Sequence, residues 1–255
     1  MSVISDSYDT YFSSGLYHKR YPNINPNVAR RILPFLSKSK RVLDFGCGIG
    51  RYTQYLLDNS KADITCFDVC HQAIDAIRKN FDPSRITTIL DDESALSSLE
   101  SFDLILSLFG VISHIGPASK RLGTLKMLSS LLRDNSESSI IITVPNKFRR
   151  FYKNQVAHIL NKQLEGHHFE PGDIIYHRVS ESKRIPLFYH LYSRNEFVRD
   201  IQAAGITPNR LFAESFFAER FVSSYPCVAK LDYYVCSMLP SVLCYGHGVI
   251  GSRSK

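Results

Sequence analysis

The stretch from Arg41 to Thr53, RVLDFGCGIGRYT, constrains the fold more than any other part of this 255-residue chain. It opens with a short apolar run that is typical of a buried strand and ends in a segment that is typical of a helix. Between them, Gly46, Gly48 and Gly50 stand at alternate positions. Glycine permits backbone angles that are closed to other residues and lets a ligand approach the chain closely. The stretch therefore predicts a nucleotide-type ligand at the carboxyl end of a first strand.

Apolar runs and helix-like segments alternate from residue 41 to residue 144, which favours a parallel sheet with helices on both faces. A further pair of β-like runs closes the domain and brings the sheet to seven strands. We predict an α/β fold with a doubly wound, mostly parallel seven-stranded sheet. The expected strands are 41–45, 62–69, 85–90, 102–110, 138–144, 206–216 and 242–251, and the expected helices are 51–59, 71–81 and 118–134.

The alternation stops after Pro145, and this indicates an insertion after the fifth strand. Residues 147–165 have a helical pattern, and 171–192 have the pattern of two strands around the polar turn SESKR. A helix over 193–205 follows, with Ser193 as its N-cap, Glu196 at the capping-box position and Gly205 past its end. We therefore expect a cover segment at 1–37, a main domain at 38–255 and an insertion at about 165–192.

The residues around the glycines indicate which nucleotide is bound. A phosphate loop needs a Lys that is absent here, and a dinucleotide turn needs a third glycine where Arg51 stands. Instead, Asp44 precedes the glycines, and an acidic residue at the end of a strand suits a ligand that carries an ammonium group beside a nucleoside. The second strand ends in Asp68, where a carboxylate accepts hydrogen bonds from ribose hydroxyls.

The segments VLDFGCGIG and FDVCHQAIDAIRKN, in this order, resemble the class I (seven-strand, Rossmann-like) S-adenosylmethionine-dependent methyltransferases over residues 38–150. The resemblance implies an enzyme that uses S-adenosylmethionine. It implies that Asp44 helps to hold the methionine end of the cofactor through the surrounding loop, and that Asp68 binds the ribose. Either Asp91 or Asp92 lies near the adenine. The full set of expected cofactor-binding residues is Arg20, Asp44, Gly46, Cys47, Gly48, Gly50, Asp68, Val69, Asp91, Asp92 and Ser107.

Methyl transfer needs alignment and exclusion of water, and it needs a base only when the acceptor loses a proton during attack. In this fold the loop at 107–116 faces the methyl group, so Ser107, Phe109 and His114 are expected beside the reacting atoms. His114 is either a base or a histidine packed against the cofactor. The catalytic candidates are His114, His190 and Tyr189, and Tyr192 is a further candidate for orienting the acceptor.

Aromatic and basic residues from outside the sheet are expected around the acceptor. The segment 8–32 carries aromatic residues and Arg20, which suit a cover over the cofactor or a helix that packs its own aromatics. The run NKFRRFYK at 146–153 suits an anionic acceptor, RNA or a solvated helix face. The residues concerned are Tyr8, Tyr11, Tyr17 and Arg20 in the first segment, and Lys147, Arg149 and Arg150 in the second.

The leading interpretation is a cytoplasmic methyltransferase that acts on a small or medium-sized metabolite. The alternatives are a tRNA-modifying methyltransferase, because FYHLYSRNEF is loosely similar to a stretch in wobble-uridine enzymes, and a non-catalytic cofactor-binding module. The net charge of +7 fits an anionic substrate, a nucleic acid, an acidic membrane surface or simply a solvated basic surface, and it decides among none of them. Six scattered cysteines without a CxxC pair favour reduced thiols and no metal, and no apolar run is long enough to span a membrane.

Overall fold

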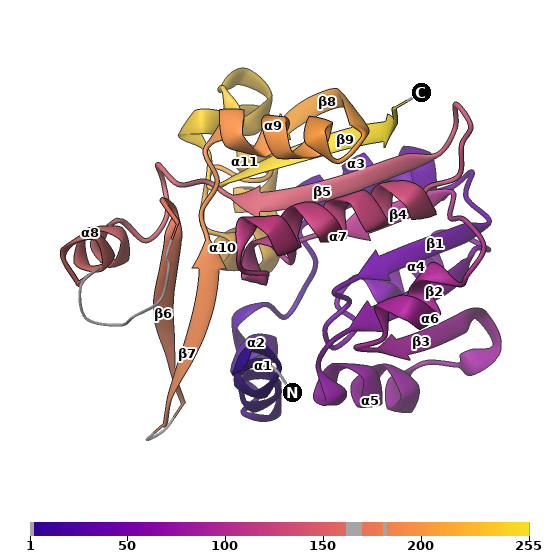
Figure 1. Ribbon diagram of the computed structural model, residues 1–255, viewed down its shortest axis with the longest axis horizontal. Coiled ribbons are helices and arrows are strands. Elements are labelled where there is room, and N and C mark those ends of the chain that lie inside the picture. The colour runs from indigo at the N-terminus through magenta and orange to yellow at the C-terminus, as the bar shows by residue number, and fades with distance from the viewer. Residues whose placement is uncertain (1–2, 162–169, 181–182, 255) are drawn as a thin grey trace.

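A seven-stranded sheet lies between two layers of helices in the computed structural model, which describes residues 3–161, 170–180 and 183–254 (Figure 1). The strand order is β3-β2-β1-β4-β5-β9-β8. Strands β1 to β5 pair in parallel, and β9 is antiparallel to both of its neighbours. This confirms the predicted fold class. The strands are β1 (Arg41–Phe45), β2 (Asp63–Asp68), β3 (Ile86–Leu90), β4 (Leu104–Ser107), β5 (Ser139–Pro145), β8 (Ile206–Ala213) and β9 (Gly246–Arg253).

Alternate strand residues point to opposite faces, and each face has its own apolar core. Leu43 and Phe45 pack with apolar residues of α6, α7 and α9, whereas Val42 packs with those of α3, α4 and α5. Strands that are buried on both faces explain the continuous apolar runs of the sequence. The helices are α3 (Pro26–Leu36), α4 (Thr53–Asp58), α5 (His71–Asn80), α6 (Glu93–Ser97), α7 (Ala118–Leu131) and α9 (Arg194–Ala203).

The carboxyl ends of the parallel strands face the N-terminal helices and a separate hairpin (Figure 1). Helices α1 (Val3–Ser13) and α2 (Leu16–Arg20) contact one another, and α1 also packs against β7 and α5. The hairpin consists of β6 (Asp173–Ser180) and β7 (Lys183–His190), with α8 (Tyr152–Asn161) on its outer side. Only α1 and α2 of the expected cover lie at this edge, because α3 packs on the sheet itself.

Several predicted boundaries move by a few residues. The helix expected over 147–165 begins at Tyr152, and residues 162–165 lie outside the described residues, as do 181–182 of the expected turn. Helix α9 has the predicted capping box, in which the Ser193 hydroxyl accepts from the Glu196 N–H at 3.3 Å. Between β8 and β9 the chain forms α10 (Glu219–Ser224) and α11 (Pro226–Met238). Within the described part of the chain, no helix has both the length and the apolar character to cross a membrane.

Candidate active site

A cavity of about 580 Å³ lies at the carboxyl ends of β1, β2 and β4, where the strand order reverses. This is the position at which open α/β sheets bind their ligands. Its floor comes from the glycine turn and the loops that follow β2, β3 and β4. Its roof and far wall come from α1, α2 and the hairpin. The cavity is thus assembled from three parts of the chain that are distant in sequence.

The glycine turn needs glycine for conformation and for space. Gly46, Gly48 and Gly50 have φ angles of 77°, 54° and 87°, in the left-handed region that favours glycine. A Cβ on Gly50 would come within 2.6 Å of the Phe81 ring, and one on Gly46 would overlap the Val111 side chain. A Cβ on Gly48 would meet nothing closer than Phe12 at 3.5 Å, so the chain is open to the cavity there. Gly46 and Gly48 line the cavity, whereas Gly50 is not among its lining residues.

Asp68, at the end of β2, is buried and lines the cavity. Its carboxylate accepts hydrogen bonds from the N–H of Gly48 at 2.8 Å and of Cys70 at 2.9 Å. Burial raises the pKa of Asp68, and these backbone hydrogen bonds oppose the rise. The Val69 N–H and the Cys70 thiol also donate to this carboxylate, so a ligand hydroxyl would share its oxygens with these donors.

Asp44 is buried within β1 and is not among the residues that line the cavity. Its carboxylate accepts from the Thr53 hydroxyl at 3.3 Å, which links β1 to the start of α4. Burial raises the pKa of Asp44 to about 7, with a smaller contribution from Asp68. Asp44 is therefore bonded to the start of α4 and does not line the cavity, and its indirect role towards the cofactor stays a prediction.

The two neighbouring aspartates after β3 have different positions. Asp91 has a φ of 44° and lines the cavity. Asp92 is exposed, and its carboxylate accepts from the Ala95 N–H at 2.8 Å as the N-cap of α6. The next residue, Glu93, also lines the cavity and was not singled out from the sequence.

Four other predicted cofactor residues are divided between the cavity and its surroundings. Val69 lines the cavity, whereas Cys47 and Ser107 are buried and do not. Arg20 lies outside the cavity, where its Nε donates to the Tyr21 hydroxyl at 3.0 Å. Arg20 lines a second hollow of about 650 Å³, which shares Tyr11 and Arg178 with the cavity and which we call the vestibule.

His114 lines the cavity and has a defined tautomer. Its Nδ1 lies 2.8 Å from the Phe188 carbonyl oxygen, which only accepts, so Nδ1 carries the proton. Its Nε2 is therefore the acceptor for the Tyr8 hydroxyl at 2.6 Å. The ring stacks on Tyr189 with centroids 4.4 Å apart. Burial lowers the pKa of His114 to about 4, so the imidazole is neutral at physiological pH.

The hairpin and the cover surround this histidine with aromatic rings. Gly110 has a φ of 78°, and a Cβ there would overlap the Tyr189 hydroxyl, so glycine lets this tyrosine reach the cavity. Phe109 also lines the cavity and adopts a φ of 62°, a strained value of a kind that recurs at functional sites. The tyrosines that line the cavity are Tyr8, Tyr11, Tyr17, Tyr21, Tyr176 and Tyr189.

Two arginines among these rings carry positive charge into the cavity. Arg150 lies over the rings of Phe151 and Tyr189, at 5.2 Å and 5.5 Å from their centroids. Arg178 lies 4.8 Å from the centroid of Tyr176, and its Nε is buried without a hydrogen-bond partner. Neither guanidinium has an ion pair with a carboxylate of the described residues. Lys147 and Arg149, from the same basic run as Arg150, do not line the cavity.

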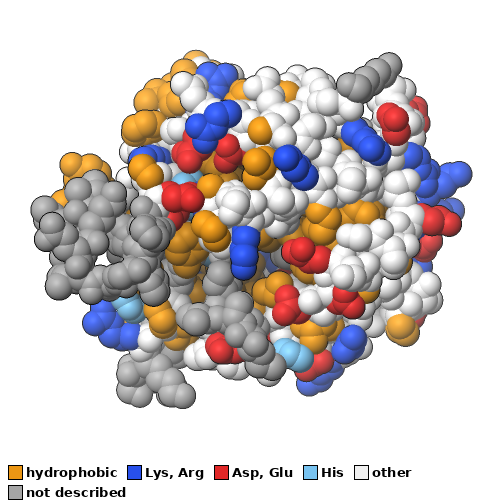
Figure 2. Space-filling model, in the orientation of Figure 1, with side chains coloured by type: hydrophobic (Ala, Val, Ile, Leu, Met, Phe, Trp, Pro, Cys, Tyr) orange, Lys and Arg blue, Asp and Glu red, His pale blue; other side chains and the backbone are white. Residues whose placement is uncertain are grey.

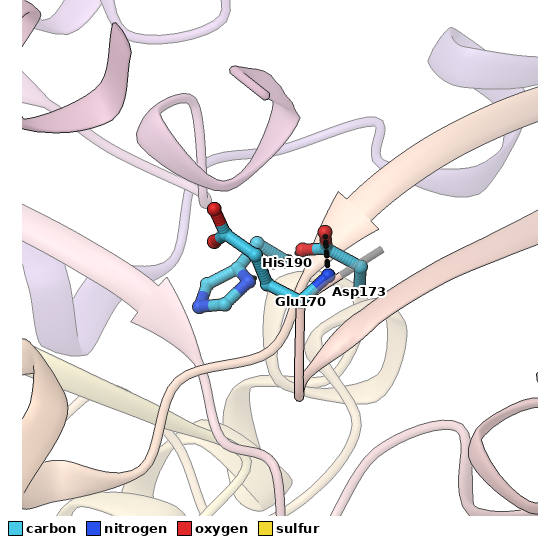
Figure 3. A group of neighbouring side chains, drawn as sticks. All are labelled: Glu170, Asp173 and His190. Carbon is cyan, nitrogen blue, oxygen red and sulfur yellow. Dashed lines mark hydrogen bonds and ion pairs between the residues drawn. The ribbon is translucent and has the colours of Figure 1, made fainter. Parts of the chain in front are cut away.

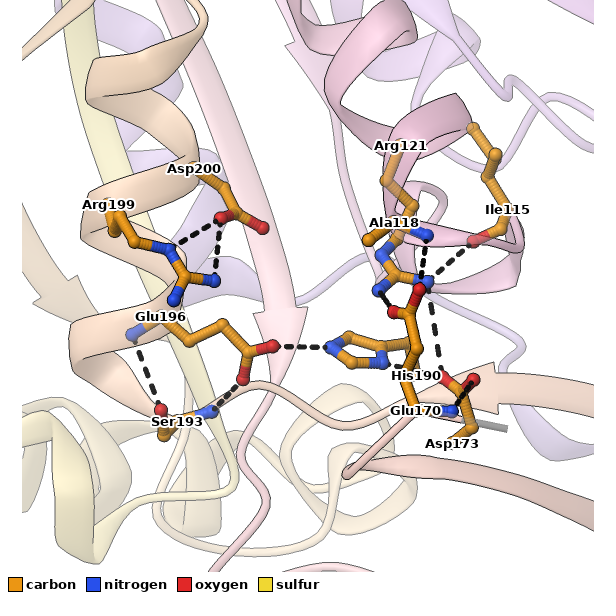
Figure 4. A network of polar contacts seen from close by, with 10 residues as sticks. All are labelled: Ile115, Ala118, Arg121, Glu170, Asp173, His190, Ser193, Glu196, Arg199 and Asp200. Carbon is orange, nitrogen blue, oxygen red and sulfur yellow. Dashed lines mark hydrogen bonds and ion pairs between the residues drawn. The ribbon is translucent and has the colours of Figure 1, made fainter. Parts of the chain in front are cut away.

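His190 lies outside the cavity, although its neighbour Tyr189 lines it. The reason is the period of a strand, which directs adjacent side chains to opposite sides. His190 is fully buried, with Nδ1 2.6 Å from Asp173 and Nε2 3.0 Å from Glu196 (Figure 4). These contacts raise its pKa against the opposing effect of burial. Tyr192 is also fully buried and away from the cavity.

Arg121 completes this network, which we call the His190 network (Arg121, Glu170, Asp173, His190 and Glu196). Its guanidinium lies 2.6 Å from Glu170 and 3.9 Å from Asp173 (Figure 4). The donor atoms of Glu170, Asp173 and His190 lie close enough together to hold a metal ion (Figure 3). Because Arg121 already supplies positive charge to both carboxylates, we assign these residues to anchoring the hairpin on α7 and α9.

Comparisons with known proteins agree with the fold and with the glycine turn. Residues 42–135 match the methyltransferase domain family. A S-adenosylmethionine-dependent methyltransferase from Methanosarcina mazei matches with a TM-score of 0.64 and 14% identity, over 91% of this chain and 100% of that one. The chain matches no curated protein.

Two further solved structures cover most of the chain. The first is the 1,6-didemethyltoxoflavin-N1-methyltransferase of Burkholderia thailandensis, with bound 1,6-didemethyltoxoflavin and S-adenosylhomocysteine. It matches with a TM-score of 0.56 and 16% identity, over 98% of this chain and 88% of that one. The second is the methyltransferase in complex with the Haloferax volcanii Trm112 methyltransferase activator, with a TM-score of 0.60 and 12% identity, over 99% and 98%. At sequence identities this low, the structural likeness shows a shared fold alone.

Proposed function

We propose that this chain is a class I S-adenosylmethionine-dependent methyltransferase whose acceptor is a small or medium-sized metabolite that carries a negative charge and a planar ring. The observation that carries this proposal is the pair Arg150 and Arg178. Both guanidiniums border a tyrosine-lined cavity, and neither has an ion pair within the described residues. The buried Glu214 attracts Arg150 from beyond ion-pair distance, and an anionic ligand in direct contact would stabilise both guanidiniums further.

The residues at the sheet edge fit the cofactor. When bound, S-adenosylmethionine supplies an electrophilic methyl group on a sulfonium. Gly46 and Gly48 would lie beneath it, because the backbone is open to the cavity at Gly48. Asp68 would accept from the ribose hydroxyls, which would share its carboxylate oxygens with the donors of the surrounding turn. Of the two neighbouring aspartates we assign the adenine side to Asp91, because Asp92 is engaged as the N-cap of α6.

The acceptor would occupy the other end of the cavity, between the cover and the hairpin. Tyr176 and Tyr189 offer ring faces for a planar acceptor, and Arg150 and Arg178 offer guanidinium groups for its anionic substituent. This arrangement aligns the acceptor and excludes water, which is most of what methyl transfer requires. The 580 Å³ volume is in the range of sites for small molecules.

We assign proton acceptance to Nε2 of His114. This nitrogen has a free lone pair because Nδ1 donates to the Phe188 carbonyl, and it is directed at the Tyr8 hydroxyl. An acceptor hydroxyl or amine could pass its proton to Nε2 through the Tyr8 hydroxyl, or it could displace that hydroxyl and bond to Nε2 directly. The low pKa keeps the imidazole neutral, so the lone pair is available throughout the physiological range. His190 and Tyr192 have no part in this proposal. Six free cysteines, of which all but Cys227 are buried, suit a cytoplasmic protein.

The vestibule favours a second candidate, a tRNA-modifying enzyme. It joins the cavity at Tyr11 and Arg178, and its lining includes Lys19, Arg20 and Arg220 but no acidic residue. A basic rim of this kind also suits an acceptor that is one nucleotide of a strand. The volume and tyrosine lining of the cavity favour the metabolite, and the basic rim of the vestibule favours the nucleic acid strand.

The decisive experiment is an acceptor screen with tritiated S-adenosylmethionine. Aromatic carboxylates, their neutral amides and total tRNA would be compared, and Arg150→Gln would be compared with Arg199→Gln, an exposed arginine of α9 paired with Asp200. We expect the wild type to transfer the tritiated methyl group to an aromatic carboxylate and not to its neutral amide. This transfer should be lost in Arg150→Gln and retained in Arg199→Gln. Transfer to tRNA alone would replace the metabolite proposal with the second candidate, and equal transfer to acid and amide would refute the role of the arginines.

A further inference from the structure

A third hollow, separate from both the catalytic cavity and the vestibule, lies on a different part of the molecule. Its volume is about 1250 Å³, and it is bordered by α3, α11, β8, β9 and the approach to β5. It shares no lining residue with the cavity or the vestibule. We call it the arginine groove. The volume exceeds the usual range of small-molecule sites, so an extended ligand fits it better than a compact metabolite does.

The charge of this groove is strongly one-sided. Five arginines line it, and Asp134 is the sole acidic residue among its lining residues. No lysine lines it. The face of the molecule in Figure 2, by contrast, mixes acidic and basic side chains. The five are Arg30, Arg31, Arg194, Arg210 and Arg253.

None of the five has an ion pair within the described part of the chain, and Arg20, Arg85 and Arg149 outside the groove likewise have none. Arg41, Arg121 and Arg133, outside the groove, each lie within 2.7 Å of a carboxylate oxygen. The groove guanidiniums therefore keep their charge available for a ligand. The gathering of five arginines in one concavity indicates that they act together on a ligand.

Two of the five are held in place by aromatic rings. Arg30 lies 5.0 Å from the centroid of Tyr233, and Arg31 lies 4.8 Å from that of Phe212. Arg31 also donates from Nη1 to the Asn27 carbonyl at 3.2 Å, while its Nε is buried without a partner. Burial and the nearby Arg210 lower the pKa of Arg31. The site is thus pre-organised and strained by like charge, and an anion would relieve that strain.

We propose that the arginine groove binds the phosphodiester backbone of single-stranded nucleic acid. The proposal rests on the five unpaired guanidiniums, the volume of the groove and two serine hydroxyls on its wall, Ser139 and Ser252. A nucleic acid strand presents one charge at every residue, which matches a concavity lined by several cations, whereas a peptide would need several adjacent acidic side chains. Guanidinium forks and hydroxyls are the groups that commonly contact phosphate oxygens. The proposal is independent of the acceptor proposed above.

The test is fluorescence anisotropy of a short labelled single-stranded RNA of mixed sequence with the full chain. The variant is Arg30→Gln combined with Arg210→Gln, both exposed in the groove. The control is Arg78→Gln combined with Arg199→Gln, which removes the same charge from exposed arginines elsewhere. Calorimetry with S-adenosylmethionine checks that both variants retain the fold and the catalytic cavity.

We expect the groove variant to weaken RNA binding at least about tenfold at low salt, and the control to change it by less than about twofold. The slope of log affinity against log salt should fall by roughly 1.4 in the groove variant, which corresponds to two lost phosphate contacts. Equal losses in both variants would show a non-specific basic surface and overturn the proposal. Stronger binding of poly-glutamate than of RNA would assign the groove to an acidic protein, and binding of ATP as tight as that of RNA would assign it to a single nucleotide.

Discussion

Two buried polar centres lie on either side of the hairpin strand β7, and they differ in how their charges are matched. In the His190 network, the two cationic groups lie within ion-pair distance of carboxylates. In the catalytic cavity, Arg150 and Arg178 have no such partner among the described residues, and His114 is neutral. A matched set stabilises the fold, whereas an unmatched set is stable only if something else compensates for it. This difference associates His114 with a ligand and His190 with the structural framework.

The largest effect should come from breaking the matched set. Arg121→Met removes the guanidinium, which leaves Glu170 without its cation and Asp173 with His190 alone, and it should lower the free energy of unfolding by about 3–5 kcal/mol. Urea denaturation monitored by circular dichroism would measure it. A loss below about 1 kcal/mol would mean that the network contributes little to anchoring the hairpin, and the contrast between the two centres would fail.

Asp44 tests an unmatched carboxylate on the cofactor side. Its pKa in the folded protein, about 7, lies above its usual value, so the folded state binds more protons and stability falls as the pH rises towards 7. Asp44→Asn removes this loss. The variant should therefore be more stable than the wild type by roughly 2–4 kcal/mol at about pH 8, and by much less at about pH 5. Thermal melting at the two pH values would measure it, and a pH-independent difference would contradict the assigned burial.

Asp68 tests the ribose site. Asp68→Ala should weaken binding of S-adenosylmethionine by about 1–3 kcal/mol, or roughly 5- to 150-fold, because a hydrogen bond to a charged acceptor is lost. Isothermal calorimetry would measure the affinity. Asp92→Ala is the matched control, because Asp92 caps α6 and should leave the affinity unchanged. An unchanged affinity in the Asp68 variant, or a loss confined to the Asp92 variant, would move the cofactor away from the assigned position.

The two histidines should give opposite pH dependences. His190 has a raised pKa in the folded state, so its stabilising contribution is complete below about pH 6.5 and is lost as the pH rises through the folded value. His114 has a lowered pKa, about 4, so it reduces stability as the pH falls from about 6.5. Relative to wild type, His190→Gln should be most destabilised in acid, and His114→Gln should gain about 1–2 kcal/mol there. Denaturation of both variants at several pH values would measure this, and slopes of the same sign would refute the assignment.

The sequence predicted the sheet because its strands are buried on both faces and therefore apolar throughout. It also predicted the glycine turn, where φ angles and crowding by Val111 and Phe81 demand glycine. Strand burial and the need for glycine are local properties, so they can be recognised from a single stretch of the sequence. The hairpin insertion was likewise visible as two short runs around a polar turn.

What the sequence did not separate depends on tertiary contacts. The doubled aspartates at 91 and 92 look alike, and their difference arises from the start of α6. His190 and Tyr189 are neighbours in one aromatic run, and the parity of β7 directs them to opposite sides. Arg178 lies in the expected hairpin at 171–192 but was not singled out, and Glu93 and Lys120 belong to no motif, although all three line the cavity. Helix α11, between the last two strands, was not predicted.

The most direct test of the contrast between matched and unmatched charge is the free energy of unfolding of Arg150→Met. If Arg150 is present to bind a ligand, replacing it with an apolar side chain of similar length should leave the stability within about 1 kcal/mol of wild type or raise it. A loss of about 3–5 kcal/mol, the size expected for Arg121→Met, would show that Arg150 is part of the structural framework and would contradict the account.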